Sequence, residues 1–374
     1  MFHTTLARHL APINPRMNRR QFIAGAAAAT TVTTFRPAFA VTKEVTIQTF
    51  ETYHEDSWIK EFTEATGIPV KVIRVGSVDE MFSLPSSGAT RPDICFIDSG
   101  TLTRFVDADL LVPFDPAKVA NAANVSPSLN WKNFNTYKGN LWGVPYAWGT
   151  IPMMYDADVI TQKPTSWAAL WDKAYAGKVS TFDDAYLNIP MVALRIGAKD
   201  SANLTDDEFN QVHAALKELR PQIRVIAKGF DDMSSLFLNK DAVIAYCQNI
   251  AVVNKLQDQG RNVQLAYPDE GTLYWVDNAL VTKFGNDRPE VYELINAGLD
   301  YAWQARFTEF SGNNLVVKAQ GALATGKLSE KGYKRSELPF MEDASFMSKM
   351  IINKVPEDID RRLQLWNDFL AGVL

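Results

Sequence analysis

Four short stretches of the chain are rich in aromatic side chains, and three of them also hold carboxylates. They are Phe50-Glu51-Thr52-Tyr53, Tyr146-Ala147-Trp148, Asp183-Asp184-Ala185-Tyr186 and Tyr274-Trp275-Val276-Asp277. An aromatic face beside a carboxylate suits an alkylammonium group, because charge pairing adds to a cation–π contact of about 0.5–2 kcal/mol. A single stretch is explained as well by an aromatic core residue next to a surface acid. Four stretches in one chain favour a binding site for a small amine.

The sequence offers few of the residues that carry catalysis or hold a metal. After residue 40 it contains two histidines, His54 and His213. It lacks the motifs of zinc proteases, serine hydrolases, phosphate-binding loops and dinucleotide-binding loops, and its carboxylates are scattered rather than grouped as metal ligands. We therefore expect a binding protein that is not an enzyme and has no metal and no cofactor. The alternative, an exported enzyme, needs a nucleophile or base at the ligand site.

The charge of the chain argues against a nucleic-acid partner. The first 40 residues hold five arginines and no acidic residue, and without them the net charge is about −10. Proteins that bind nucleic acids carry basic faces that neutralise phosphates. We therefore expect a small-molecule ligand and no nucleic acid.

Residues 1–40 have the features of an export signal. Arg19-Arg20 precedes a mildly apolar run over residues 22–35, and Ala38-Phe39-Ala40 gives a cleavage site. The stretch NRRQFI resembles the twin-arginine signal, and an ordinary secretory signal with two arginines is the alternative. Met1 and Met17 are both suitable starts. The signal predicts a soluble periplasmic protein.

Strand-like and helix-like patterns alternate in two successive groups, over residues 44–98 and 166–267. The expected strands are 44–50, 68–75, 92–98, 178–182, 223–226, 242–246 and 262–267, and the expected helices are 55–66, 77–87, 166–175, 187–196, 205–219, 233–238 and 250–259. Such alternation predicts mainly parallel sheets flanked by helices. A chain of 374 residues is long enough for two such domains.

The stretch LWGVPYAWGT, residues 141–150, lies between the two groups. It suits an aromatic core strand, an exposed association patch, or a bend between two lobes whose rings face a ligand. Its position favours the bend. We expect Gly143 and Pro145 to set that bend, Trp148 to face the ligand and Trp142 to pack in the core.

Several motifs, in their order along the chain, resemble the periplasmic polyamine-binding proteins, the putrescine and spermidine receptors of ABC importers. They are WGVPYAWGT, PTSWAALWDKAYAGKVSTFDDA, YPDEGTLYWVDN and the segment KVPEDIDRRLQLW, which is similar to the family's C-terminal helix. The resemblance covers nearly all of the chain after the export signal. It implies a receptor that binds a polyamine such as putrescine or spermidine.

The same resemblance implies the two-lobed α/β fold of type II periplasmic binding proteins. Residues 41–146 and 279–330 would form lobe 1, and residues 147–278 and 331–374 would form lobe 2. LWGVPYAWGT and Tyr274–Val281 would be segments that cross between the lobes. The partners would be an amine and an inner-membrane ABC permease, and the receptor would act as a monomer.

The resemblance also points to ligand contacts, with Trp275 as a ring wall and Asp277 as an amine partner. With Trp148 from the stretch above, the expected site is Phe50, Glu51, Asp98, Ser99, Trp148, Asp184, Tyr246, Trp275 and Asp277. Phe50 and Tyr246 stand where the family has tryptophans.

Two positions depart from the family pattern. Leu187 replaces a glutamate, and Asn249 replaces an aspartate of putrescine binders. An unpaired ammonium in a closed site costs several kcal/mol, although Glu51 and Asp98 can partly replace the missing acids. An amino acid like γ-aminobutyrate or another small amine is therefore an alternative ligand, and a sugar is a further one. The candidates for an arginine that would meet a ligand carboxylate are Arg74, Arg91, Arg224 and Arg306.

Overall fold

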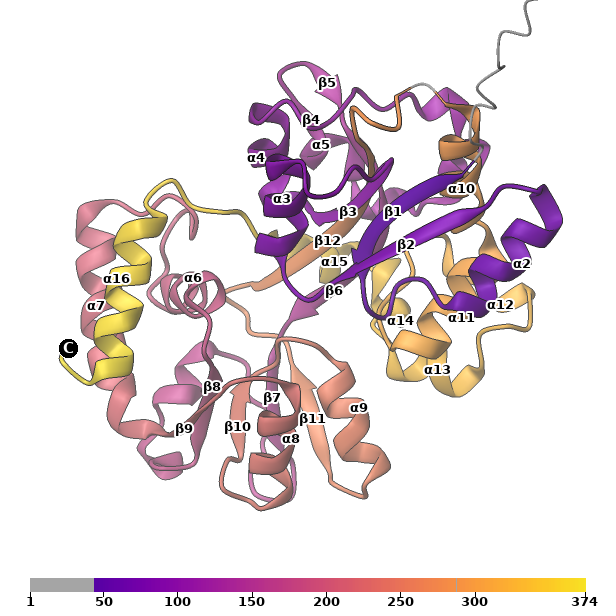
Figure 1. Cartoon of the computed structure of the whole chain (residues 1–374). Coiled ribbons are helices and arrows are strands. Elements are labelled where there is room, and N and C mark those ends of the chain that lie inside the picture. The colour runs from indigo at the N-terminus through magenta and orange to yellow at the C-terminus, as the bar shows by residue number, and fades with distance from the viewer. Residues whose placement is uncertain (1–43, 287) are drawn as a thin grey trace, which may run out of the picture. The chain divides into compact units, whose positions relative to one another are not determined.

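The computed structural model describes residues 44–286 and 288–374, which form two β-sheets with helices packed around each (Figure 1). The export signal expected at residues 1–40 lies outside the described residues. Within them, no helix has the length and apolarity needed to cross a membrane.

The first sheet has the strand order β13-β12-β3-β1-β2, and β6 also pairs with β12. Its strands are β1 (Val45–Phe50), β2 (Val70–Val75), β3 (Ile94–Asp98), β6 (Gly143–Ile151), β12 (Thr272–Val281) and β13 (Met350–Ile352). β1 is parallel to β2 and β3, as strands joined by helices must be. β12 comes from late in the chain and lies antiparallel to both β3 and β6 (Figure 1).

The second sheet has the order β11-β7-β10-β8-β9. Its strands are β7 (Met153–Asp156), β8 (Val179–Phe182), β9 (Ile223–Ala227), β10 (Ile244–Tyr246) and β11 (Val263–Ala266). β8 runs parallel to β9 and β10, whereas β7 is antiparallel to β10 and β11. A short hairpin, β4 (Thr136–Tyr137) with β5 (Asn140–Leu141), stands apart from both sheets.

The helices around the first sheet come from both ends of the described chain. They are α2 (Asp56–Thr66), α3 (Val78–Ser87), α4 (Leu102–Asp107), α5 (Trp131–Phe134), α10 (Pro289–Gly298), α11 (Tyr301–Ser311), α12 (Ala319–Ala324), α13 (Glu330–Arg335), α14 (Leu338–Met341) and α15 (Ala344–Ser348). α2 ends at Gly67, whose left-handed backbone (φ 70°) allows its N–H to bond the carbonyl of Thr63.

The helices around the second sheet are α6 (Ala185–Arg195), α7 (Asp206–Leu219), α8 (Phe230–Leu238), α9 (Ala251–Asp258) and α16 (Ile359–Ala371). Thr205 and Glu208 form the capping box that begins α7. α16 packs against α6 and α7, so the end of the chain joins the second sheet (Figure 1).

The expected elements agree with this structure with one exception. The range 166–175 is not a regular helix: it forms two 3₁₀ turns, Trp167–Trp171 and Lys173–Tyr175. Asp172 separates the turns with extended backbone and caps the second one through its side chain, and this local hydrogen bond competes with helix continuation.

The chain passes between the sheets in three places: at Pro152, over residues 267–271, and over residues 353–358. LWGVPYAWGT and Tyr274–Val281 were expected to cross and instead lie almost entirely in β6 and β12 of the first sheet. The cause is their mutual pairing along nearly their whole length, which holds β6 in the first sheet up to the crossing at Pro152 and holds β12 there after the crossing over residues 267–271.

The two hydrophobic cores divide the chain differently from the lobe boundaries expected above. The first core includes Trp148, Tyr274, Leu338 and Met341, although all four fall in ranges assigned to lobe 2. Within residues 331–374, α16 contributes Leu365, Trp366 and Phe369 to the second core. The division we propose therefore places all of β6, all of β12 and residues 331–352 in the first lobe.

His54 is a buried group of the first core that should make stability depend on pH. Its ring stacks on Tyr146 (centroids 5.0 Å apart), and Nδ1 lies 3.1 Å from Oγ1 of Thr49. Burial lowers the pKa of His54 to about 3. Because this pKa lies below the unfolded value of about 6.5, the stabilisation is complete above pH 6.5 and is lost as the pH falls towards 3.

We expect the His54→Gln variant to lose this pH dependence. Between pH 7.5 and pH 5, the linkage removes about 2 kcal/mol of unfolding free energy from the natural protein and not from the variant. Urea unfolding at the two pH values measures the difference, with exposed His213→Gln as the control. Equal losses in all three proteins would contradict the prediction.

Candidate functional site

Two carboxylates face each other where β3 ends beside β12. Asp98 is the last residue of β3 and is the register partner of Asp277 on β12. We call these two residues the carboxylate pair. Oδ1 of Asp98 accepts a hydrogen bond from the Gly100 N–H (2.7 Å), whereas its Oδ2 is shielded from solvent and has no hydrogen-bond partner in the described chain.

Asp277 is the more buried member of the pair, with 7% of its surface exposed. One of its oxygens accepts a hydrogen bond from the Tyr53 hydroxyl. Burial raises the pKa of Asp277 to about 6, and burial together with the charge of Asp277 raises the pKa of Asp98 to about 8. Neither carboxylate forms an ion pair with a described residue. Among the described residues, the site therefore offers no positive charge that these acids could bind.

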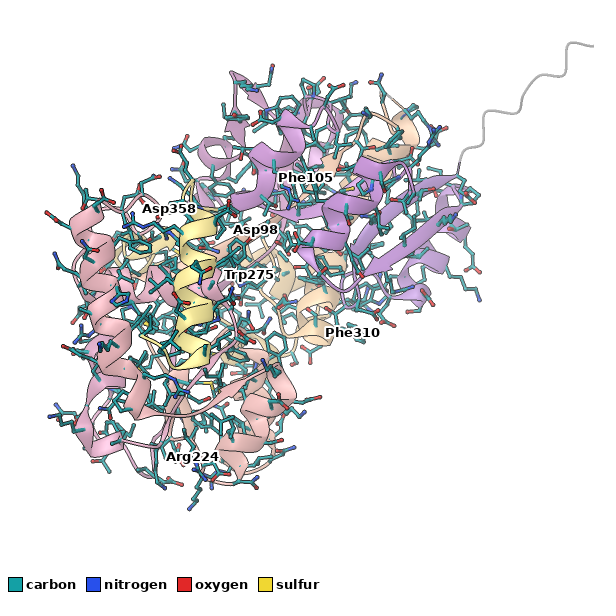
Figure 2. The ribbon with its side chains drawn as sticks, turned by 60° about the vertical axis from the view of Figure 1, so that its left-hand side comes forward. Asp98, Phe105, Arg224, Trp275, Phe310 and Asp358 are labelled. Carbon is teal, nitrogen blue, oxygen red and sulfur yellow. The ribbon has the colours of Figure 1, made fainter. Side chains whose placement is uncertain are left out.

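Trp275 lies two residues before Asp277 on β12, and it packs against both hydrophobic cores. Its indole lies against the backbone of Gly149 on β6, its register partner. A Cβ on Gly149 would stand 2.6 Å from Cζ2 of Trp275, so only glycine lets the ring lie this close. Figure 2 shows Trp275 near Asp98 in the middle of the molecule.

We therefore expect Gly149→Ala to displace the Trp275 ring. The overlap should lower the unfolding free energy by about 1–3 kcal/mol and change the intrinsic fluorescence of the protein. Gly76→Ala is the matched control, because its Cβ would meet a side-chain oxygen of Glu80 at an ordinary 3.8 Å. Identical spectra and stabilities for the two variants would argue against the packing described here.

Ser99 was expected to contact the ligand, and its hydroxyl is already engaged. It donates to the carbonyl of Val276 (3.0 Å) and accepts from Nδ2 of Asn278 (2.8 Å). These two bonds fix the chain after β3 against β12. Ser99 therefore positions Asp98 in this structure.

Asp184 has a structural role at the beginning of α6. It is the N-cap of α6: Oδ1 accepts from the N–H of Tyr186 (2.8 Å), and Oδ2 accepts from Nε2 of Gln248 (2.9 Å). Burial raises the pKa of Asp184 despite these bonds. Both of its oxygens thus already have donors, in contrast to Oδ2 of Asp98.

Three other expected contacts differ in exposure. Phe50 is half-buried at the end of β1, with its ring edge-on to Tyr53 (5.5 Å). Glu51 is exposed in the following turn. Tyr246 ends β10 and is fully buried, packed on Phe182 at 5.3 Å. The first sheet thus brings Phe50, Asp98, Ser99, Trp275 and Asp277 together, and the second sheet carries Asp184 and Tyr246.

Trp148 was expected to face the ligand, and the structure contradicts this. Its surface is 0% exposed, and its Nε1 donates to the carbonyl of Leu315 (2.8 Å). All nine residues of β6 are buried, because the strand is covered on both faces. Trp142 packs in a core cluster as expected, with Nε1 donating to the carbonyl of Tyr137.

The two positions that depart from the family pattern also have defined surroundings. Leu187 is buried on α6 with 7% of its surface exposed. Nδ2 of Asn249 donates to Oδ1 of Asn313 (3.0 Å), which joins the loop after β10 to the loop after α11. Asn249, where the family pattern has an aspartate, therefore forms an amide pair with Asn313.

No arginine candidate for a ligand carboxylate reaches the carboxylate pair. Arg74 binds Asp56 (2.5 Å), and Arg306 binds Glu61 (2.7 Å). Arg91 lies over the ring of Phe284. Arg224 is exposed on β9, and Figure 2 shows it far from Asp98 and Trp275. In the part of the chain described, no three or more His, Cys, Asp or Glu side chains group as metal ligands.

Tyr53 and Gly149 belong to the site and were absent from the expected set. Tyr53 lies in an aromatic stretch that the sequence does single out, but its bond to Asp277 spans 224 residues. Gly149 gives no chemical signal of its own. It matters because the ring of Trp275 occupies the space where its side chain would be.

Comparison with known proteins agrees with this architecture. Residues 57–329 match the family described as bacterial extracellular solute-binding protein. The spermidine/putrescine-binding periplasmic protein of Escherichia coli K12 is 25% identical over 241 residues, which are 64% of this chain and 67% of that protein. The putrescine/agmatine-binding protein of Pseudomonas aeruginosa is 22% identical over 329 residues, 84% of this chain and 88% of that protein.

A solved structure shows the same fold. The spermidine/putrescine ABC transporter substrate-binding protein PotD from Streptococcus pneumoniae has a TM-score of 0.76 at 22% identity, covering 88% of this chain and 99% of that chain. The type II, two-lobed α/β fold expected from the sequence is therefore confirmed. Because the family match spans more than half of the sequence, the chain belongs to the bacterial extracellular solute-binding proteins.

Proposed function

We propose that this protein captures a small amine, a polyamine such as putrescine or spermidine, for an ABC importer. The observation that carries this proposal is the carboxylate pair. Asp277 is buried, Asp98 is half-buried with one shielded oxygen that has no donor, and no described cation pairs with either residue. A protein seldom leaves such acids unpaired unless a ligand supplies the charge. The curated relatives named for spermidine, putrescine and agmatine support the same class of ligand.

The ammonium would bind Asp277 and Asp98, and Trp275 would lie along the alkyl chain. We keep Phe50, Glu51, Ser99, Asp184 and Tyr246 as proposed members of the site. Asp184 and Tyr246 both belong to the second lobe, and burial first, then the charge of Asp184, raises the pKa of Tyr246. Ligand between the lobes would stabilise a closed arrangement, and no reaction is catalysed.

The setting of this function follows from the same family. We propose that the protein is exported by a twin-arginine signal at residues 1–40 and works as a soluble monomer in the periplasm. Its protein partner would be the permease of the importer, and it would bind no nucleic acid.

A thermal-shift screen of the purified protein tests the proposal. The panel holds putrescine, spermidine, agmatine, γ-aminobutyrate and glucose. A ligand at 100 times its dissociation constant should add about 2.7 kcal/mol to the unfolding free energy. We expect the amines to stabilise and glucose to have no effect. A response to γ-aminobutyrate alone, to glucose, or to none of them would overturn the polyamine proposal.

A further inference from the structure

The carboxylate pair combines two like charges in one small space. Asp98 and Asp277 are directly opposite on antiparallel strands, where Cβ atoms stand about 4.5–5.5 Å apart and like charges destabilise the sheet. Two carboxylates that share a site cannot both ionise easily, and one of them takes up a proton.

The groups around the pair do not neutralise it. The turn after β1 contributes Tyr53 and His54, and burial keeps the pKa of Tyr53 well above its usual value, so its hydroxyl stays a neutral donor. On β6, the Tyr146 hydroxyl donates to the carbonyl of Tyr53. His54 is neutral at pH 7, since burial lowers its pKa to about 3.

One cation comes close through its backbone. The Cα of Lys354, in the crossing segment 353–358, lies 3.2 Å from where a Cβ on Gly100 would stand, next to Asp98. The charge of Lys354 also acts on Asp200 of the second lobe, where hydrogen bonds from Asn203 and Ala202 and then this charge lower the pKa of the carboxyl. In the described chain the pair therefore has no internal counter-ion.

We propose that the carboxylate pair binds one ammonium group of the ligand in exchange for one proton. In the free protein, one proton stays on the pair. When the ammonium arrives, the proton leaves a carboxyl oxygen for a buffer base, and the ammonium N–H groups donate to both carboxylates, including Oδ2 of Asp98. One positive charge replaces another, so the site's total charge does not change. This inference rests on the proposed function and goes beyond it, because it assigns to the carboxylate pair a proton that the ligand displaces.

The exchange predicts how affinity depends on pH. A pair with an upper pKa of about 8 holds its proton at pH 6–7, so each unit of pH increase in that range should strengthen amine binding about tenfold. Above pH 8 the free pair has already lost the proton, and the affinity should level off. A site with two permanently charged acids would show no such slope.

Calorimetry of putrescine and spermidine binding tests the exchange. Titrations at pH 7 in phosphate and in Tris, which differ in ionisation enthalpy, count the protons released. We expect close to one proton per ammonium bound at the pair for the natural protein. Asp98→Asn should reduce the release to near zero and flatten the affinity between pH 7 and pH 8. The control is Asp207→Asn, because Asp207 is exposed on α7.

The outcomes separate the two proposals. Absence of amine binding at every pH would overturn the proposed function itself. Amine binding without proton release by the natural protein would overturn the exchange alone, as would an Asp98→Asn variant that releases as many protons as Asp207→Asn. The proton count of the natural protein decides the matter even if Asp98→Asn fails to fold.

Discussion

Replacing Glu337 with alanine is expected to remove about 3–5 kcal/mol of unfolding free energy. Glu337 is 1% exposed, and no cation pairs with it in the described residues. Its carboxylate accepts from the Thr150 N–H (3.1 Å), the Thr150 hydroxyl, the Tyr267 hydroxyl (2.8 Å) and Nδ2 of Asn314 (2.8 Å). Alanine would leave all four donors buried without an acceptor.

Glu337 also lies beside two of the connections between the lobes, so its loss should affect lobe movement. Thr150 lies two residues before the crossing at Pro152, and Tyr267 begins the crossing over residues 267–271. One carboxylate thus ties two of the three connections to Asn314 of the first lobe. We expect removal of the Glu337 carboxylate to loosen both connections together. Amide hydrogen exchange should then increase more in these crossing segments than in strand β1.

Urea unfolding and hydrogen exchange measure these effects. Glu357→Ala is the matched control, because Glu357 is exposed in the third crossing segment, and surface substitutions stay within about 0.5 kcal/mol. Glu337→Gln should lose an amount of unfolding free energy between those of the two alanine variants. Its amide oxygen can still accept hydrogen bonds, but its amide nitrogen is a donor and would face donors that the second carboxylate oxygen accepted from. A loss below 1 kcal/mol for Glu337→Ala would show that water replaces the carboxylate without cost.

Local patterns were enough to predict the strands and helices of residues 44–98 and 178–267, whereas the other elements, among them β6, β12 and α10–α15, were not predicted from them. The strand at 44–50, the helix at 55–66 that stops at Gly67, and the capping box at Thr205 are each set by residues close in sequence. The alternation of strands and helices along the chain likewise predicted a layered α/β fold. The 3₁₀ turns at 167–175 escaped prediction because their apolar spacing is the same as that of a helix.

The site depended on information that local patterns do not carry. Asp98 and Asp277 are 179 positions apart and meet because β12 inserts antiparallel beside β3. The orientation of Trp148 was equally inaccessible, since a strand buried on both faces shows no alternation of polar and apolar residues. Asp184 matched the family at its position, but the sequence could not show that α6 and Gln248 occupy both its oxygens.

The structure helps to interpret Leu187 and Asn249, the two residues that depart from the family pattern. Leu187 and the Asn249–Asn313 amide pair offer no charge, whereas the first lobe carries two facing acids. The two acids that face each other at the proposed site therefore lie on β3 and β12, and Asp184 is the acid that the second lobe contributes. A polyamine would place one ammonium at the carboxylate pair, which leaves Asp184 and Glu51 as the acids for its other end.

Asp277→Asn is expected to weaken putrescine binding by about 2–5 kcal/mol, a loss of about 30-fold or more in affinity. The asparagine removes the charge of the most buried acid at the site and keeps an oxygen that can accept from Tyr53. Burial raises the pKa of Asp277 to about 6, so above that pH its charge opposes folding and the neutral amide does not. Binding and stability should therefore move in different directions, with unfolding free energy unchanged or higher at pH 8.

Calorimetry with putrescine and urea unfolding at pH 8 give the two quantities, and Asp207→Asn serves again as the control. A variant that loses both binding and stability would indicate that Asp277 is a structural residue whose bond to Tyr53 holds the sheet. A variant that keeps full affinity would move the ammonium to another carboxylate, with the half-buried Asp98 and Asp184 as the remaining candidates. Only loss of affinity with intact stability assigns the ammonium to Asp277, because in that case the charge itself, and not the fold it sits in, is what the ligand requires.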